Sequence, residues 1–506
     1  MRLATAVRTA LPGYPTAPPY DPPEPYPEYP FGEGAISAHP NPVYRAVRQL
    51  LHDLGLDRKR FGTPQWDPLG ELLSSDRGEQ LIVLKPNWVV HDIPRDPREE
   101  ENLLALITHP SVIRPLLDYA LIALVRRGGG RMVLGDAPIQ RCQWERLLGL
   151  FGTVEMVERF ACRLPAEVQF ELKDFRYEVT LRDEHNVVLR REFRPEVEYV
   201  LVDLGQKSSL MPIIQDYRRF RVTNYDPRVV PQNHNPERNL YFVHRDFLAA
   251  KLVVNLPKLK CHRKAGITCA LKNLVGINCR KDYLAHHRAG DAESGHGDQY
   301  ERRSRLKELR NFLMERFDLF ADRPTLQRLL RYLMAAIDRL VRLHDPHLNY
   351  DGSWWGNDTC WRMVHDLNKL LCYASPEGEM TDGLCRTEIS LVDGVIGGEG
   401  NGPLHPTARR CGVLLAGFNP VAVDHLAAAL MGLDWRKIAL LREAWHPIPA
   451  ELALVPEGSC RDQIEVLVDG AVRSLSWVEE NLAIPFEPPP GWKGRVELER
   501  FASPAG

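Results

Sequence analysis

The sequence predicts an α/β fold, with an open, mainly parallel sheet and flanking helices. Three short apolar runs, at residues 81–84, 131–134 and 252–254, have the composition of buried strands. A helical segment from about residue 108 to residue 127 separates the first two runs, and three consecutive glycines end it. The order strand, helix, strand forms a βαβ unit, which is normally parallel and right-handed.

Two insertions interrupt this pattern. Short β-rich segments separated by polar turns fill residues 165–204 and predict an antiparallel β insertion. Two long helical patterns at residues 306–343 predict a helical hairpin insertion. The chain then divides into a Pro/Tyr-rich extended arm (1–35), a first α/β part (36–160), the antiparallel β insertion (161–215), a central α/β part with a basic motif (216–295), the helical insertion (296–350), a C-terminal α/β part with a Gly-rich acidic loop (351–480) and an irregular tail (481–506).

Composition argues against several partners. The 506 residues include 65 Lys and Arg and 67 Asp and Glu, a formal net charge of -2, so neither nucleic acid nor an acidic membrane is expected as a partner. Ten cysteines without a C-x-x-C pair are typical of reduced thiols in a cytoplasmic protein. No apolar run approaches the length of a membrane span and the N-terminus lacks a signal-peptide core, so the cytoplasm is the expected location.

Residues 251–276, KLVVNLPKLKCHRKAGITCALKNLVG, concentrate side chains that bind anions. Pro257 is expected to end the strand, because proline has no N–H to donate to a sheet. A basic loop and then a helix over residues 267–275 are expected to follow, an arrangement that can hold phosphate or carboxylate. The alternative is a solvated basic loop. The residues expected to surround the anion are Lys258, Lys260, His262, Arg263 and Lys264 in the loop, and Lys272 and Asn273 in the helix.

Polar residues follow the other predicted strands as well. The carboxyl ends of the strands in an open α/β sheet line one edge, so these residues should converge on one cleft. They are Lys85 and Asn87 after the first strand, Asp136 after the second, and Asp393, Glu399 and Asn401 in the Gly-rich acidic loop. The oxygens of Asp393 and Glu399 suit a hard cation such as Mg²⁺, with Asp136 as a further ligand. The alternative for this loop is a glycine turn with solvent-facing acids.

Arg362 lies on a helix that is expected to begin near residue 360. Asp358 and Asp366 are each four residues away, so the three side chains share one helix face. This arrangement is either an ion-pair ladder or an anion clamp that the two acids orient. Both interpretations remain open.

Six motifs occur in an order that resembles a known family: LKPNWV, THPSVIRPLLDYA, GDAPIQ, LPKLKCHRKAGITCALKNLVGI, VDGVIGGEGNGP and NPVAVDHLAAALMG. They span about residues 80–435 and resemble the family catalogued as domain of unknown function 362. The family's central motif resembles Pro-Lys-x-Lys-Thr-His followed by Lys-Asn, with Cys261 here in place of the threonine. Many members carry ferredoxin-like cysteine clusters for [4Fe–4S] centres, and this chain has no such run. The resemblance implies an architecture more firmly than a reaction.

A cleft with a basic half and an acidic half suits an anionic substrate together with a divalent cation. We therefore expect an enzyme that acts on a phosphorylated or carboxylated small metabolite, with His262 as general acid or base. The full set of expected catalytic residues is His262, Lys260 and Lys272. The expected substrate-binding residues are Lys85, Asn87, Lys258, Asn273, Arg362 and Asn401, and the expected ligands for Mg²⁺ or another divalent cation are Asp393, Glu399 and Asp136.

Two other functions remain open. An iron–sulfur-linked redox protein could use Cys261, Cys269 and Cys279, and a colourless protein without iron would argue against it. A non-catalytic binding or assembly subunit is favoured by the Pro/Tyr-rich arm, which can wrap the body of the chain or a partner subunit in a homo-oligomer. A melting temperature that no metabolite shifts would support that alternative.

Overall fold

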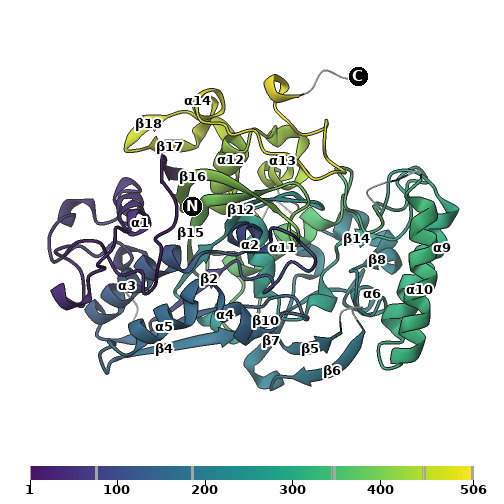
Figure 1. Cartoon of the computed structure of the whole chain (residues 1–506), viewed down its shortest axis with the longest axis horizontal. Helices are drawn as coiled ribbons and strands as arrows, with labels where there is room; N and C mark the ends of the chain where they lie inside the picture. Colours follow the sequence, from purple (N-terminus) through teal and green to yellow (C-terminus); the bar gives the residue numbers. More distant parts are fainter. Residues whose placement is uncertain are drawn as a thin grey trace.

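The computed structural model describes residues 2–73, 78–183, 187–343, 345, 349–446, 448 and 452–502. Residues 184–186 of the predicted antiparallel insertion, residues 344 and 346–348 of the predicted helical insertion, and residues 503–506 of the predicted tail lie outside this description. A large central sheet lies between a helical region at one end of the molecule and a helical hairpin at the other (Figure 1).

Eleven strands form one mixed sheet within the described residues. Its path runs β18 (Ala471–Arg473), β17 (Glu465–Val468), β1 (Ala4–Arg8), β16 (Thr407–Gly417), β15 (Thr387–Glu399), β11 (Leu252–Leu256), β2 (Leu81–Pro86), β3 (Gly130–Asp136) and β4 (Val168–Asp174), with β12 (Lys258–His262) and β13 (Gly266–Thr268) beside it. The strands from β4 to β15 run parallel to one another, and β16 is antiparallel to both of its neighbours.

Both faces of this sheet are buried. In β2, Leu81 and Val83 enter one hydrophobic core, whereas Ile82 and Leu84 enter the other. Successive side chains of a strand point to opposite faces, so a strand with a core on each side needs an unbroken apolar run. This physical requirement explains why residues 81–84 and 252–254 were recognisable as strands from the sequence.

Helices cover both faces of the sheet. One face packs against α1 (Pro42–Asp53), α2 (Glu99–Leu106), α3 (Pro110–Arg126), α4 (Trp144–Leu148) and α5 (Thr153–Ala161). The other packs against α7 (Arg245–Ala249), α8 (Ala270–Asn273), α11 (Cys360–Tyr373), α12 (Pro420–Leu430), α13 (Ala439–Arg442) and α14 (Leu475–Asn481). A mostly parallel sheet between two helical layers is an α/β fold, so the predicted fold class is confirmed.

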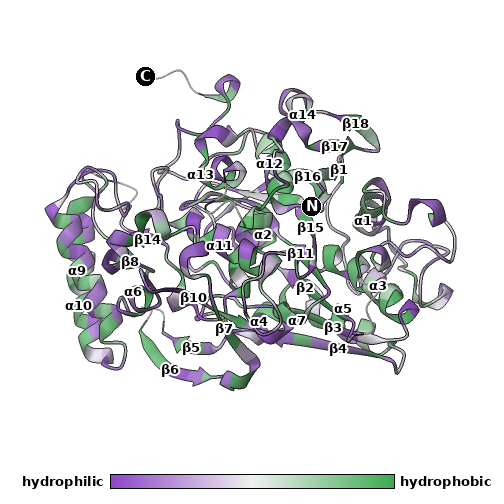
Figure 2. Ribbon diagram, turned by 180° about the vertical axis from the view of Figure 1, so that it is seen from behind, coloured by the Kyte–Doolittle hydropathy of each residue, from purple (hydrophilic) through white to green (hydrophobic). Residues whose placement is uncertain are grey.

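The insertions contain the small antiparallel sheets and the helical hairpin. β5 (Glu178–Arg182) pairs with β6 (Val188–Phe193), β10 (Arg238–His244) pairs with β7 (Tyr199–Asp203) and β9 (His234–Asn235), and β8 (Phe220–Arg221) pairs with β14 (His287–Arg288). α6 (Val229–Asn233) is a short helix between β8 and β9. The hairpin consists of α9 (Arg305–Leu319) and α10 (Pro324–Val341), along which polar and apolar segments alternate (Figure 2).

One segment of the predicted antiparallel insertion belongs elsewhere. β4 extends the main sheet and runs parallel to β3. Its residues alternate between apolar and polar because an edge strand is only partly buried. That alternation resembles the pattern of an antiparallel strand, which explains why the sequence assigned it to the insertion.

The Pro/Tyr-rich arm packs on the body of its own chain. β1 lies between β16 and β17, antiparallel to the first and parallel to the second. The N-terminal segment accordingly lies next to the C-terminal strands in Figure 1. Farther along the arm, the Tyr20 hydroxyl donates a hydrogen bond to the carbonyl oxygen of Phe151 at 2.7 Å.

The predicted anion-binding stretch forms a hairpin rather than the predicted loop and helix. β12 continues the chain beyond Pro257, parallel to β15 and antiparallel to β13. The long strand β15 pairs with β11 and then with β12, so the proline interrupts the ladder without ending the sheet. The predicted helix is reduced to the four residues of α8, followed by the 3₁₀ turn η8 (Leu274–Ile277).

The predicted Gly-rich acidic loop is mostly strand β15. A Cβ atom on Gly398 would lie 2.9 Å from the Cβ of Lys260, and one on Gly397 would lie 2.7 Å from the ring of Phe486. These glycines therefore allow neighbouring segments to pack closely against β15. The sequence interpretation of a flexible ligand-binding loop was wrong for residues 393–399.

Candidate functional site

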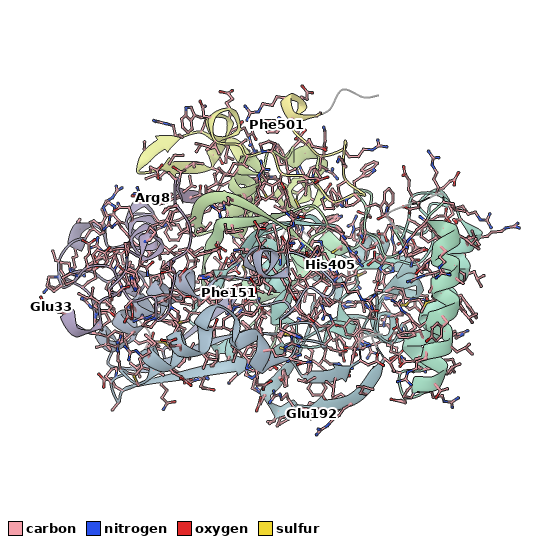
Figure 3. The ribbon with its side chains drawn as sticks, viewed as in Figure 1. Arg8, Glu33, Phe151, Glu192, His405 and Phe501 are labelled. Atoms are coloured by element: carbon pink, nitrogen blue, oxygen red, sulfur yellow. The ribbon has the colours of Figure 1, made fainter. Side chains whose placement is uncertain are left out.

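A cavity of about 870 Å³ lies at the carboxyl ends of β2, β3 and β12, where α/β sheets bind ligands. Residues 137–143 after β3 and residues 403–405 after β15 form parts of its wall, and His405 is labelled near the middle of the molecule in Figure 3. Arg182 of β5 and Arg331 of α10 also line it, so both insertions contribute to the mouth. Its size suits a small metabolite.

The lining of this cavity is strongly basic. Among the described residues, eleven lysine and arginine side chains line it, against four aspartates. The buried lysines form a lysine floor, which consists of Lys85, Lys260, Lys264, Lys272 and Lys281. The partly or fully exposed arginines form an arginine rim, which consists of Arg95, Arg141, Arg146, Arg182, Arg263 and Arg331. A concave surface with this excess of one charge concentrates ligands of the opposite charge.

Lys85 is neutralised within the protein by Asp136. Its Nζ lies 2.8 Å from Asp136 Oδ1, and Asp136 also accepts hydrogen bonds from the backbone N–H groups of Trp88 and Ala137. Burial lowers the pKa of Lys85, and the nearby Asp136 carboxylate partly opposes this effect. The two predicted residues are thus brought together, but as an ion pair that joins the ends of β2 and β3.

Gly276 in η8 packs directly against this ion pair, because a Cβ atom there would overlap Asp136 Oδ1 and Lys85 Nζ. We expect Gly276→Ala to lower the free energy of unfolding by about 1–3 kcal/mol, the usual cost of overpacking a buried site. Denaturant titration measures this change. Gly383→Ala is the matched control, since a Cβ at Gly383 meets open space, and equal stability of the two variants would contradict the prediction.

Asn273 joins the ends of β2 and β11. Its Nδ2 donates to Asn255 Oδ1 at 2.8 Å and to the carbonyl oxygen of Lys85 at 3.2 Å, and its Oδ1 accepts from Asn87 Nδ2 at 3.0 Å. Although Asn273 lines the cavity, both polar atoms of its side-chain amide are therefore already hydrogen-bonded to the protein. Asn87 lines the same cavity, and its buried Oδ1 has no hydrogen-bond partner among the described residues.

His262 lines the cavity and is set up as a hydrogen-bond donor. Its Nδ1 accepts the backbone N–H of Lys264 at 3.0 Å, so the neutral ring carries its proton on Nε2. Burial lowers its pKa well below the usual value, and the ammonium group of Lys272 lowers it further. A neutral imidazole with an Nε2–H can donate to a substrate oxygen. The prediction was a general acid or base, and this geometry favours the donor role over that of a base.

Lys260 and Lys272 both line the cavity. Lys260 Nζ donates to the carbonyl oxygen of Leu106 at 2.7 Å, and burial together with the ammonium of Lys258 lowers its pKa well below the usual value. Burial also lowers the pKa of Lys272, the nearby Cys360 thiol raises it, and the ammonium groups of Lys264 and Lys85 lower it further. Both lysines are therefore easier to deprotonate than a lysine in water.

Lys258 and Asp393 lie outside the cavity lining, as a fully buried ion pair. Lys258 Nζ donates to Asp393 Oδ2 at 2.9 Å and to the Tyr14 hydroxyl at 2.6 Å. Asp393 also accepts from the Tyr14 hydroxyl at 2.7 Å and from the backbone N–H of His109 at 2.9 Å. The arm residue Tyr14 thus completes a structural cluster, which excludes Lys258 from the predicted substrate contacts.

Three further predicted residues also lie away from the cavity lining. Glu399 accepts the backbone N–H of Glu487 at 3.1 Å, and Asn401 is exposed. Arg362 Nη2 pairs with Asp358 at 3.1 Å, Nη1 donates to the carbonyl oxygen of Ser209, and the guanidinium stacks on Trp361. The pair between Arg362 and Asp358 matches the ion-pair interpretation. The Asp366 carboxylate instead accepts hydrogen bonds from the hydroxyl groups of Ser208 and Tyr241.

The predicted cation ligands are not assembled into one site. Asp136 and Asp393 already accept several hydrogen bonds from the protein, and Glu399 accepts a hydrogen bond from the backbone N–H of Glu487. No group of three or more His, Cys, Asp and Glu side chains in the described ranges is arranged to hold a metal ion. The residues present therefore do not fit the predicted Mg²⁺ site.

The three cysteines considered for an iron–sulfur cluster are bonded to different parts of the chain. Cys261 Sγ donates to the carbonyl oxygen of Glu487, and Cys279 Sγ donates to that of Ile277. Burial raises the pKa of the Cys269 thiol well above its usual value, and Asp424 beside it adds to the shift. Protonated, separately bonded thiols are poor cluster ligands.

The sequence reasoning missed most of the arginine rim and one member of the lysine floor, Lys281. Arg141 and Arg146 follow β3, which ends at Asp136, so their position after a strand was a usable signal. Arg182 and Arg331 come from the two insertions, and only the tertiary fold brings them to the cavity.

None of the described helices combines the length and the apolar character that a membrane crossing requires. Residues 206–429 match the family described as "Domain of unknown function (DUF362)". No curated protein matches the chain. A crystal structure of a protein from Thermotoga maritima matches 73% of this chain at 11% identity, with a TM-score of 0.29. The match covers 53% of that protein, so this chain spans about half its length, and the similarity carries no functional argument.

Proposed function

Because residues 206–429 belong to the DUF362 family, whose description assigns no function, we propose a function from the chemistry of the cavity. The protein is an enzyme that acts on an anionic small metabolite, phosphorylated or carboxylated, bound between the lysine floor and the arginine rim. The observation that carries this proposal is the burial of five lysines in one cavity, against four aspartates along its whole lining.

The partners of the aspartates leave much of this positive charge uncompensated. Asp136 pairs with Lys85, Asp92 pairs with Arg141 at 2.6 Å, and Asp351 pairs with both Arg263 and Lys264. Burying a charged group without a counter-charge is costly, so a protein keeps such groups where a ligand supplies the missing charge. An anion in this cavity offsets the cost, and a neutral ligand does not.

The chemistry of the floor supports turnover as well as binding. Lysines with lowered pKa values accept and release protons more readily near neutral pH, which is the property of acid–base groups in active sites. Lys260 and Lys272 have this property, and His262 offers a donor to a developing negative charge on oxygen. In the proposed enzyme Lys260 and the arginine rim bind the anionic group, and His262 stabilises charge during the reaction.

Calorimetric titration with inorganic pyrophosphate tests the binding step. We expect binding that weakens between 50 mM and 200 mM salt, and Lys260→Met should reduce affinity about tenfold or more, since a charge-assisted hydrogen bond contributes about 1.5–3 kcal/mol. An anion favours the protonated lysines, so binding should take up protons and weaken as pH rises. The heat measured in buffers of different ionisation enthalpy reports that uptake.

Lys59→Met is the matched control, because Lys59 is exposed and does not line the cavity. It should bind pyrophosphate as the wild-type protein does. Turnover is then followed by mass spectrometry in mixtures of phosphorylated and carboxylated metabolites, with Lys260→Met as the inactive reference. No binding of any anion would refute the proposal, and binding without turnover would leave only the anion-binding part of it.

A further inference from the structure

One lysine of the floor differs from the other four. Lys85 pairs with Asp136, Lys264 pairs with Asp351 at 3.1 Å, and Lys260 and Lys281 donate to backbone carbonyl oxygens at 2.7 Å and 2.8 Å. Lys272 has no hydrogen-bond or ion-pair partner among the described residues, yet the residue is only 8% exposed. An ammonium group with so little access to water and no counter-charge is unfavourable.

Two more buried polar atoms are left unpaired in the same cavity. Thr268 is 3% exposed and its Oγ1 has no partner among the described residues, and the same holds for Asn87 Oδ1. Both residues line the cavity together with Lys272 and His262. Buried polar atoms normally have partners, so a cluster of unsatisfied atoms around one cavity indicates that a ligand supplies them.

The backbone around Lys272 is fixed rather than mobile. Asp424 of α12 accepts the backbone N–H groups of Ala270 and Leu271, at 2.6 Å and 3.1 Å, and so anchors the start of α8. At the other end of α8, Asn273 is bonded to Asn255 and Asn87. Lys272 is thus held between two anchored residues, with its amine in the cavity and free to react.

We propose that Lys272 is a nucleophile that forms a Schiff base with a carbonyl compound bearing a phosphate or carboxylate group. The inference rests on the proposed function, because the lysine floor and the arginine rim must bind the anionic end of that compound. The inference adds the reacting group of the substrate, which is a ketone or aldehyde carbon that Lys272 attacks. It therefore narrows the substrate class to anionic carbonyl compounds.

The surroundings of Lys272 favour this reaction over a purely electrostatic role. A lysine amine is nucleophilic only when neutral, and burial beside other cations, as at Lys264 and Lys85, favours the neutral form. An electrostatic anchor would gain from a fixed acceptor or a counter-ion, as the other four floor lysines have. An amine that attacks a carbonyl carbon needs a free lone pair, so it must be neutral and not held by a counter-ion.

The reaction balances without an oxidant or reductant. The lone pair of Lys272 Nζ forms a bond to the carbonyl carbon, and the electron pair of the C=O π bond moves to oxygen. One proton passes from nitrogen to that oxygen, which gives a carbinolamine. The C–O bond then breaks, the leaving oxygen takes a second proton from nitrogen, and one water leaves as C=N forms. His262 Nε2–H and the Thr268 hydroxyl are the cavity donors available to that oxygen.

Pyridoxal 5′-phosphate tests the inference as a probe, since it is an aldehyde that carries a phosphate. The full-length protein is incubated with the probe at neutral pH, reduced with borohydride and digested, and the modified lysines are located by mass spectrometry. We expect Lys272 to be labelled at least about tenfold faster than the exposed Lys59, because each unit of lowered pKa gives about ten times more neutral amine. Pyrophosphate should protect Lys272 and leave Lys59 unaffected.

Three variants separate the nucleophile from a structural lysine. Lys272→Arg keeps the charge but should lose the label at this position, and Lys59→Met, which changes a lysine outside the cavity, should retain labelling at Lys272. Lys272→Met should melt at the same or a higher temperature than the wild-type protein, because it removes an unpaired buried charge. A large loss of melting temperature in Lys272→Met would instead indicate a structural role.

The possible failures are distinguishable. If pyrophosphate binds but the probe labels Lys272 no faster than Lys59, the proposed function stands and the Schiff-base inference is overturned. If neither pyrophosphate nor any other anion binds, and the probe labels Lys272 no faster than Lys59, both are overturned. Fast labelling of Lys281 or Lys264 in place of Lys272 would also overturn the inference, since it would assign the reactive amine to a lysine that has a partner.

Discussion

Replacing Asp393 with alanine is expected to lower the free energy of unfolding by about 3–5 kcal/mol, because it leaves a buried lysine without its counter-charge. Lys258 and Asp393 are both fully buried, with Nζ and Oδ2 2.9 Å apart. Asp393 also accepts from the Tyr14 hydroxyl and from the backbone N–H groups of His109 and Val395, so its loss frees four donors at once. The sequence interpretation of Asp393 as a metal ligand predicts intact folding for the same variant.

Urea titration of Asp393→Ala and of Glu399→Gln measures the contrast. Glu399 was the second expected metal ligand, but it is half-buried, and its partners in the described part of the chain are the backbone N–H of Glu487 and, at 3.8 Å, Arg409. We expect its variant to lose less than about 1 kcal/mol. A melting temperature that rises with Mg²⁺ in the wild-type protein but not in either variant would contradict the structural interpretation.

Replacing Arg176 with alanine is the second change for which we expect a large effect, again a loss of about 3–5 kcal/mol in the free energy of unfolding. Its guanidinium pairs with Asp174, with Nη2 and Oδ2 2.6 Å apart, and its Nη1 donates to the carbonyl oxygens of Ile139, Gln140 and Cys142. Arg176 is 1% exposed, so its removal deprives Asp174 of its close ion-pair partner and leaves the three carbonyl oxygens without this donor.

The destabilisation in Arg176→Ala should extend to the cavity, because Ile139, Gln140 and Arg141 line that cavity. Hydrogen exchange of residues 138–143 should become faster in Arg176→Ala, and pyrophosphate affinity should fall. Arg194→Ala is the matched control, since Arg194 reaches the same Asp174 carboxylate at 3.7 Å but is exposed, and it should cost less than about 1 kcal/mol. Equal losses in the two variants would contradict the importance of the Arg176 contacts.

The sequence predicted the central strands and helices well because burial on both faces leaves a strong signal. Residues 81–84 and 252–254 are apolar throughout, and the helix that begins at Cys360 has a clear amphipathic pattern. β12 was missed because its residues, KLKCH, read as a charged loop after a proline. The two lysines and the histidine can occupy a strand because they alternate with Leu259 and Cys261, which enter the core.

The site was predicted in part for the same reason. The alternation places Lys258, Lys260 and His262 on one face of β12, as an anion-binding motif requires. Their distance along the strand then decides their roles, since Lys258 reaches Asp393 and Tyr14, whereas Lys260 and His262 line the cavity. The pairing with Tyr14 spans 244 residues and leaves no local signal in the sequence.

The insertion of β1 between β16 and β17 has a consequence for the time course of folding. Val7 pairs with Leu415 and with Val468, so the edge of the central sheet closes only when both distant segments have been synthesised. At about 5–20 residues per second, a ribosome needs roughly 20–90 seconds to travel from Val7 to Val468. During that interval the backbone N–H and C=O groups of the apolar strand β1 lack their partners in the sheet. Chaperones shield segments in this state in growing chains.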